Sequence, residues 1–241
     1  MTSGELNSAV KDIPMTDGIA RLRINDEGFP VPWFVPWRDD KPIMNMADAE
    51  KYAAARRLNL CWCCGTNLGQ YKAFVIGPMC AINRISSDPP SHRLCAEYAV
   101  RACPFLRNPR MRRNPNSPDH KVAPPGIMIE RNPGVSLIWV TKTYRRLPEG
   151  LFELGDPSHL SYWREGRHAT RDEILESVNS GLPILRKQAQ EDGPAAMRQL
   201  EQMIERARQL IPEYSDEHNP TGNPSHPAEP AAAGVHHGDS G

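Results

Sequence analysis

Apolar residues recur in the first half of the chain with the spacings of both helices and strands. The alanine-rich segment 47–59 has acidic residues early and basic residues late, which predicts a helix. The short apolar run 72–77 closes with Gly-Pro and predicts a buried strand. Apolar positions at helical spacing then predict a second helix, which Asp88 or Ser91 can cap and which Pro104 ends.

The second half of the chain combines strands with C-terminal helices. Apolar runs predict strands at 127–131, 135–147 and 151–155. The capping box of Thr170 and Glu173 predicts a helix that Gly181 ends. Pro183 opens another short helix, and an amphipathic helix follows over 194–211. These elements define an α+β fold with a short antiparallel β-sheet and C-terminal helices.

The composition indicates a cytoplasmic protein without a membrane anchor. The chain has 241 residues, enough for one large or two small domains, and its 24 prolines indicate that part of it lies outside any core. The longest apolar stretch, 73–82, is about half the roughly 20 residues that span a bilayer, and the N-terminus lacks the pattern of a secretory signal. We therefore expect the six cysteines to be reduced, and clustered cysteines in such a protein bind a metal or act in catalysis.

Four of the cysteines lie close together around the first predicted strand. Cys61 and Cys64 form C-x-x-C and are followed directly by Gly65. A tight turn that ends in a left-handed glycine lets two thiolates converge on one ion. Cys63 lies inside this turn, so we expect its side chain to point elsewhere and to hold no metal.

A second pair of ligands opens the second predicted helix. His92 and Cys95 lie three positions apart and therefore share one helical face. A C-x-x-C-G turn, a strand and a helix that opens with H-x-x-C together resemble the treble-clef zinc proteins, over residues 60–103. This resemblance implies a structural Zn²⁺ held by Cys61, Cys64, His92 and Cys95.

Of the two remaining cysteines, Cys80 is a possible metal ligand and Cys103 is not. Cys80 follows the strand and the Gly-Pro turn, so it could enter the site in place of His92. An iron–sulfur cluster held by Cys80 and the three other candidate cysteines is the alternative cofactor, but it would leave His92 unexplained. Cys103 lies about 12 Å beyond Cys95 along a helix, too far to share an ion, so we expect it in the core.

A further similarity covers a larger part of the chain. The run CWCCG…FVIGPMC…PPSHRLCAEYA…CPFL, with GFPVPWF before it and WREGRHATRDEIL after it, is similar to uncharacterised bacterial and phage-borne proteins over residues 20–190. That similarity implies no established activity.

Proline and charge divide the chain into five segments. GFPVPWFVPW, at 28–37, interleaves proline with large apolar side chains. This pattern favours an extended arm packed on the domain over a ligand platform or a proline-rich docking segment. We expect a mobile leader (1–18), the Pro/Trp arm with a helix and the zinc module (19–106), a basic Pro-rich loop (107–125), strands and C-terminal helices (126–212) and a disordered tail (213–241).

The net charge of zero hides a strong segregation of charge. Residues 51–150 carry 16 Lys and Arg against 5 Asp and Glu, whereas the flanking segments are acidic. This favours an anionic partner, DNA or RNA, over simple neutralisation of the acidic C-terminal helices or of a protein partner. The candidate nucleic-acid-binding residues are Arg56, Arg57, Arg84, Arg93, Arg107, Arg110, Arg112 and Arg113.

Three functions are consistent with these features. The leading hypothesis is a non-enzymatic structural-zinc protein that binds nucleic acid. The second is a protein-interaction or assembly factor that uses the Trp-rich arm and the last helix. The third, a metal- or thiol-dependent enzyme centred on Cys63, Cys80 and Cys95, is least favoured. Four filled positions would leave no water on the zinc, and P-loop, dinucleotide-binding and nucleophile-elbow motifs are absent.

Overall fold

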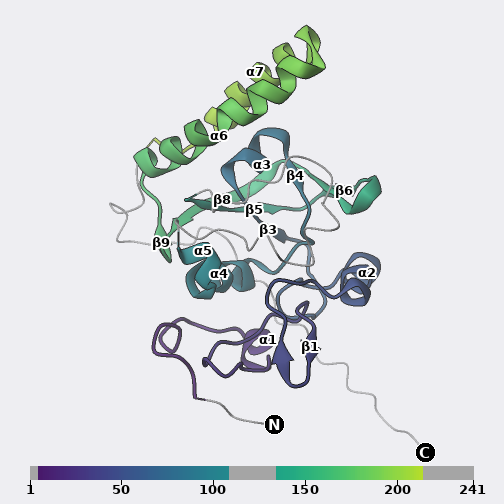
Figure 1. Ribbon diagram of the computed structural model, residues 1–241, viewed down its shortest axis with the longest axis vertical. Helices are drawn as coiled ribbons and strands as arrows, with labels where there is room; N and C mark the ends of the chain where they lie inside the picture. The colour runs from purple at the N-terminus through teal and green to yellow at the C-terminus, as the bar shows by residue number, and fades with distance from the viewer. Residues whose placement is uncertain (1–4, 109–133, 214–241) are drawn as a thin grey trace, which may run out of the picture.

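The computed structural model describes residues 5–108 and 134–213 (Figure 1). Helices and small antiparallel sheets are mixed within it, so the predicted α+β class is confirmed. The predicted strand at 127–131, most of the predicted basic loop and the predicted tail from 214 onward lie outside the described residues.

A four-stranded antiparallel sheet lies at the centre of the fold. Its strands, in spatial order, are β3 (Lys72–Ile76), β5 (Ser136–Thr141), β8 (Pro157–Arg164) and β9 (Arg167–His168). Phe74 of β3 lies opposite Trp139 of β5. All six residues of β5 are buried, because layers of helices cover both faces of the sheet (Figure 1).

Alternate residues of the central strands pack into two different layers. Phe74 and Trp139 point into the main core, whereas Ala73 and Ile138 pack against α4 on the opposite face. The main core is closed by α3 (Pro78–Asn83), α6 (Arg171–Asp192) and α7 (Pro194–Arg208), and the opposite face by α4 (Arg93–Ala102) followed by α5 (Pro104–Arg107).

Smaller elements surround this centre. A three-stranded sheet is formed by β4 (Ile85–Ser86), β7 (Phe152–Leu154) and β6 (Tyr144–Arg146), with the 3-10 turn η2 (Pro148–Gly150) between β6 and β7. The N-terminal part holds α1 (Asp17–Ala20), the hairpin of β1 (Trp37–Arg38) and β2 (Lys41–Pro42), and α2 (Ala49–Leu58).

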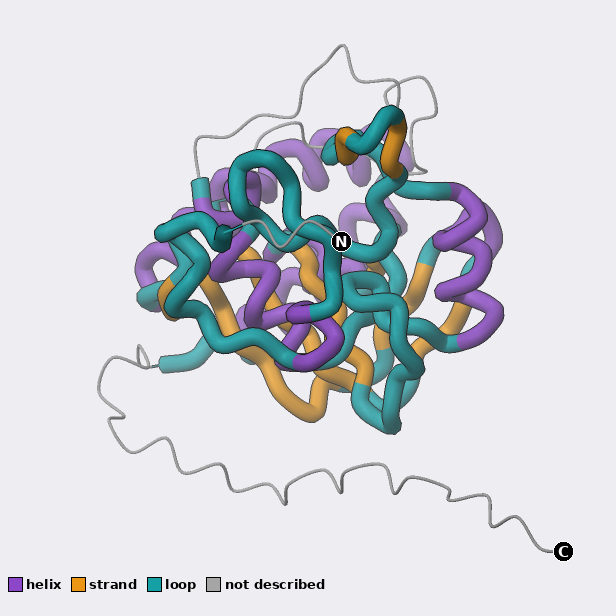
Figure 2. Tube along the Cα trace, turned by 90° about the horizontal axis from the view of Figure 1, so that it is seen from below, coloured by secondary structure: helices purple, strands orange, loops and turns teal. Residues whose placement is uncertain are grey.

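The N-terminal segment predicted as a mobile leader is packed against the fold. Val10 is fully buried and Ile19 nearly so, and both belong to a cluster that contains three cysteines of the C-x-x-C turn. Seen from below, the N-terminal loops cross the body of the protein (Figure 2). The regularly placed apolar side chains of this segment supply the burial that a mobile leader would lack.

The arm at 28–37 lies on the domain, as interpreted from its sequence. Trp33 donates its backbone N–H to the carbonyl of Cys63 at 2.7 Å. Phe34 stacks on Trp62, with ring centroids 4.4 Å apart and planes inclined by 6°. Large aromatic side chains of the arm therefore cover the cysteine-bearing turn.

The structure divides one predicted strand and adds a hairpin that the sequence did not indicate. The predicted strand 135–147 is divided into β5 and β6, because Thr141 Oγ1 donates to the carbonyl of Thr143 at 2.9 Å and closes a tight turn. The hairpin of β8 and β9 was not predicted. Its turn residues Glu165 and Gly166 have φ of +54° and +80°, the left-handed pair that a two-residue hairpin requires.

The helix predicted to end at Gly181 continues. The helix α6 runs on through both Gly181 and Pro183 to Asp192. Gly181 is buried against Met79 of α3, where a Cβ atom would overlap the methionine side chain. This glycine therefore allows close helix packing and does not end the helix.

Among the described residues, no helix is long and apolar enough to cross a membrane.

Candidate metal centre

The C-x-x-C segment folds as a tight turn held by backbone hydrogen bonds. Cys61 donates its N–H to the carbonyl of Thr66 at 2.7 Å, and Gly65 donates to the carbonyl of Cys61 at 2.8 Å. Gly65 has φ of +75°, the left-handed conformation that favours glycine. The turn brings Cys61 and Cys64 to the same side.

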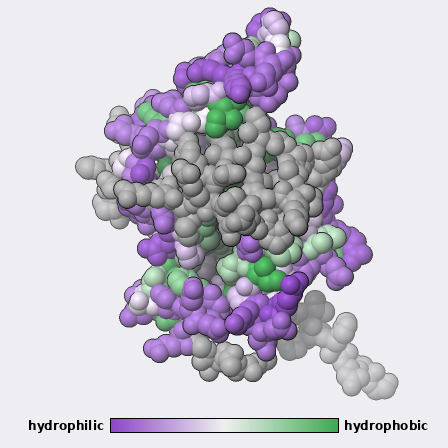
Figure 3. Space-filling view, viewed as in Figure 1, coloured by the Kyte–Doolittle hydropathy of each residue, from purple (hydrophilic) through white to green (hydrophobic). Residues whose placement is uncertain are grey.

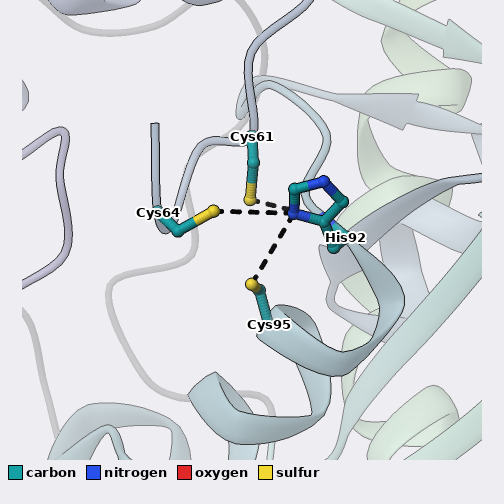
Figure 4. Close-up of side chains that lie close together, drawn as sticks. All are labelled: Cys61, Cys64, His92 and Cys95. Carbon is teal, nitrogen blue, oxygen red and sulfur yellow. Dashed lines mark hydrogen bonds between the residues drawn. The ribbon is translucent and has the colours of Figure 1, made fainter. Parts of the chain in front are cut away.

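The start of α4 supplies the other half of the cluster. His92 is the N-cap of α4 and Cys95 lies in its first turn, so both side chains face the C-x-x-C turn (Figure 4). The ligand atoms of Cys61, Cys64, His92 and Cys95 all lie within 4.8 Å of one another. These four residues therefore lie close enough together to hold a metal ion.

Two distances within the cluster match those around a tetrahedral ion. His92 Nδ1 lies 3.5 Å from the Sγ of Cys64 and 3.7 Å from the Sγ of Cys95. A tetrahedral zinc with bonds of about 2.3 Å to sulfur and about 2.1 Å to nitrogen places these ligand atoms about 3.6 Å apart. The donor set of three thiols and one imidazole is also one that zinc sites use.

Hydrogen bonds from outside the cluster orient its members. His92 Nε2 donates to the carbonyl of Asn67 at 3.0 Å, because a carbonyl can only accept, and this leaves Nδ1 free to bind a metal. The hydroxyl of Thr66 lies 3.2 Å from the Sγ of Cys64, and that of Thr16 lies 3.6 Å from the Sγ of Cys95. Such outer contacts fix ligand geometry and strengthen metal binding.

The pKa values show that the four groups compete for protons. Hydrogen bonds with Cys63, and then with Cys64 and Cys95, lower the pKa of Cys61. Hydrogen bonds with Cys61 and Cys64 raise the pKa of Cys95, and they raise the pKa of His92 to about 10. A bound cation would take the place of these shared protons, because thiolate and neutral imidazole are the forms that bind metal.

The other cysteines lie outside the cluster. Cys63 is buried and accepts a hydrogen bond from Ser91 Oγ at 3.3 Å, and its pKa is raised by its hydrogen bond with Cys61 and by burial. Cys80 lies in α3 and packs against the main core, where burial raises its pKa. The structure does not bring Cys80 to the four. Cys103 lies between α4 and α5, and burial raises its pKa too.

The described candidate arginines lie on separate elements. Arg56 and Arg57 are on α2, and the guanidinium of Arg56 lies 5.0 Å above the ring of Phe152. Three other arginines already bind groups of the protein itself. Arg84 pairs with Asp156 at 2.7 Å and Arg93 with Glu97 at 3.0 Å. Arg107 donates a hydrogen bond to the carbonyl of Ala9 at 3.4 Å. Arg110, Arg112 and Arg113 lie outside the described residues.

Sequence reasoning missed the contribution of the N-terminal segment to this site. Thr16 caps α1 and reaches Cys95, and Gly18 lies against Cys64. A usable signal was present, because threonine followed by aspartate marks a helix start, and the apolar Ile19 and Leu22 follow it.

No protein-family model, curated protein or solved structure significantly matches the chain.

Proposed function

We propose that Cys61, Cys64, His92 and Cys95 bind one Zn²⁺ as a structural ion. The observation that carries the proposal is the set of four donor atoms within 4.8 Å of one another, two of whose distances match a tetrahedral zinc. Four protein ligands leave no coordination position for water or substrate, which is the pattern of structural zinc sites. Cys61 is fully buried and Cys95 is 1% exposed, so the ion would be shielded from solvent.

The ion would join parts of the chain that are distant in sequence. The turn that carries Cys61 and Cys64 packs under the arm, and α4 packs on the central sheet. The order of turn, strand and ligand-bearing helix supports a treble-clef-type module. Its strand β3 pairs mainly with β5, outside the module, and meets Ser91 through an isolated bridge at Ala73.

Metal analysis of the purified protein tests the structural site. We expect about one zinc per chain for the natural sequence and for Cys80→Ala, and none for Cys95→Ala. Cys80→Ala is the matched control because it removes a partly buried thiol outside the cluster. Purified protein that contains no zinc would contradict the proposal. So would protein that contains iron and sulfide and absorbs visible light, because that result indicates an iron–sulfur cluster.

The zinc-stabilised protein would bind nucleic acid through its basic middle segment. The supporting observation is the excess of 16 Lys and Arg over 5 Asp and Glu within residues 51–150. Arginine-rich surfaces bind phosphate through charge and bidentate hydrogen bonds. Anisotropy of labelled duplex DNA and single-stranded RNA should show binding that weakens steeply between about 50 and 200 mM salt. Absence of binding at low salt would rule this function out.

The alternative functions receive less support from the packing. For a protein-interaction factor, the aromatic Phe34 of the arm already stacks on Trp62. The helical hairpin of α6 and α7 projects from the body, but the face of it seen in Figure 3 is mainly hydrophilic. For a thiol enzyme, Cys80 lies away from Cys63 and Cys95, in the main core.

A further inference from the structure

Basic side chains are carried by α2, by β6 and by the residue Lys142 just before β6, and we name this region the α2–β6 face. Tyr144 of β6 donates its hydroxyl hydrogen to Asn59 Oδ1 at 3.5 Å, and the hydroxyl of Tyr52 on α2 donates to the carbonyl of Gly150. These contacts join β6 to the C-cap of α2, and α2 to the η2 turn that follows β6. The cations of the face are Arg56, Arg57, Lys142, Arg145 and Arg146.

Most of these cations lie over aromatic rings. Arg56 lies 5.0 Å from the ring centroid of Phe152 and 5.8 Å from that of Tyr52. Arg146 lies 5.9 Å above Tyr144 in the same way. Lys142, two residues before Tyr144, lies 5.3 Å above Tyr71. Aromatic faces hold these cations in place without neutralising them.

Elsewhere in the described part of the chain, several arginines pair with carboxylates. Arg23 binds Asp40 at 3.1 Å, Arg186 binds Glu201 at 2.8 Å, and Arg167 binds Glu173 at 2.7 Å. On the α2–β6 face, the described side chains provide one such pair, between Arg145 and Glu153. Among the described residues, the face therefore carries more cations than carboxylates that pair with them.

We infer that the α2–β6 face binds the phosphate backbone of a nucleic acid. This rests on the proposed nucleic-acid-binding function and adds Lys142, Arg145 and Arg146 to the arginines expected from the sequence. Arg56 donates to the hydroxyl of Tyr52 at 3.5 Å, and Arg146 donates to that of Tyr144 at 3.4 Å. A guanidinium has five N–H donors in one plane, so each of these side chains has further donors that match two phosphate oxygens. Within the described ranges, binding phosphate there would break no ion pair of Arg56 or Arg146, and charge complementarity favours a polyanion.

A pair of double variants with equal charge change tests the inference. Arg57→Gln/Arg146→Gln removes two exposed cations from the α2–β6 face. Arg198→Gln/Arg206→Gln removes two exposed cations from α7, at the other end of the fold, and is the matched control. Binding of labelled duplex DNA and single-stranded RNA is measured by anisotropy between about 50 and 200 mM salt, with circular dichroism and thermal melting to confirm folding.

The expected result is a loss specific to the face variant. Its affinity for duplex DNA at low salt should fall about tenfold, and the slope of log K against log salt should fall by about 1.8, since each phosphate contact contributes about 0.9. The α7 control should match the natural protein. If the double variant melts early, the single variants Arg57→Gln and Arg146→Gln provide the same test, each lowering the slope by about 0.9.

The contrary outcomes separate the two proposals. If the natural protein binds neither nucleic acid at low salt, both the proposed function and the α2–β6 face are overturned. If it binds, but the face variant and the α7 control behave alike, only the face is overturned. If poly-glutamate competes as well as nucleic acid of equal charge, the partner is an acidic protein and phosphate recognition is overturned.

Discussion

The hydroxyl of Thr16 lies 3.6 Å from the Sγ of Cys95, although 79 residues separate them in the sequence. The same oxygen accepts a hydrogen bond from the N–H of Ile19 and so caps α1. Two residues on, Gly18 lies so close to the cluster that a Cβ atom there would be 2.9 Å from the Sγ of Cys64. The N-terminal segment thus packs against the Cys/His cluster and contributes a hydrogen bond to one of its sulfurs.

Replacing Thr16 with valine should weaken zinc binding about tenfold. Valine keeps the shape of threonine but removes the O–H that donates to the Cys95 sulfur, and loss of such an outer hydrogen bond costs 10- to 100-fold in affinity. Competition with a chromophoric chelator measures the change. Thr16→Ser, which keeps the hydroxyl, should restore most of the affinity. Equal affinity in the valine variant and the natural protein would show that this contact does not support the site.

Gly65 should be replaceable by alanine only at a large cost in stability. Its left-handed backbone disfavours any side chain by about 1 kcal/mol or more. A Cβ atom at this position would also lie 2.6 Å from Cγ of Trp33. Denaturant unfolding of the zinc-loaded protein should therefore show that the free energy of unfolding falls by clearly more than the cost of the left-handed backbone alone.

Gly134 is the matched control for Gly65. It has φ of +88°, but a Cβ atom there would meet no atom of the described residues within 4 Å. Gly134→Ala should therefore cost only the backbone term, about 1 kcal/mol. Equal losses at the two positions would mean that the contact with Trp33 has no energetic role.

The four residues of the candidate metal centre could be picked from the sequence because each pair is set by local geometry. C-x-x-C-G defines a turn, and H-x-x-C at a helix start defines one face of its first turn. That the two pairs meet depends on packing between the turn and α4, and the treble-clef resemblance supplied this link. Thr16 could not be assigned in the same way, because its contact with Cys95 depends on the path of the N-terminal segment.

In the fold, too, features set by neighbouring residues in the sequence could be predicted, whereas features set by contacts with distant residues could not. The capping box of Thr170 and Glu173 was predicted and is present at the start of α6. The predicted end of that helix was wrong, because Gly181 was interpreted from its local tendency to end helices. The structure shows that the role of Gly181 is set by its contact with α3. Local sequence identifies caps and turns well, but it does not identify a glycine that is required by a neighbouring helix.

Gly181→Ala should destabilise the protein, against the usual trend. In an exposed helix, glycine to alanine gains about 1 kcal/mol. Here the added methyl group would displace the side chain of Met79, and overpacking of a core costs about 1–3 kcal/mol. We expect a net loss of about 1 kcal/mol by urea unfolding. In a Met79→Ala background, which provides space, the same change should be neutral or stabilising. A stabilising effect in both backgrounds would refute the close-packing role.

Glu173 should make the stability of the protein depend on pH in the acidic range. Its carboxylate binds Arg167 at 2.7 Å and the N–H of Thr170 at 2.8 Å. The hydrogen bond with Arg167 is the main reason that its pKa falls from 4.5 to about 2. Because the folded pKa lies below the unfolded value, this carboxylate stabilises the protein at neutral pH, and the contribution declines as the pH falls from about 4.5 towards 2.

Glu173→Gln isolates this contribution, because glutamine can still bond to Thr170 but carries no charge for Arg167. We expect the variant to be less stable by about 1 kcal/mol at pH 7, a value that allows for solvent screening of the partly exposed Arg167. The difference from the natural protein should shrink as the pH approaches 2, and urea unfolding of both proteins at several pH values measures it. Loss of zinc at low pH affects both proteins equally and cancels in the difference. A difference that stays constant from pH 7 to pH 3 would show that the charge of Glu173 does not stabilise the start of α6.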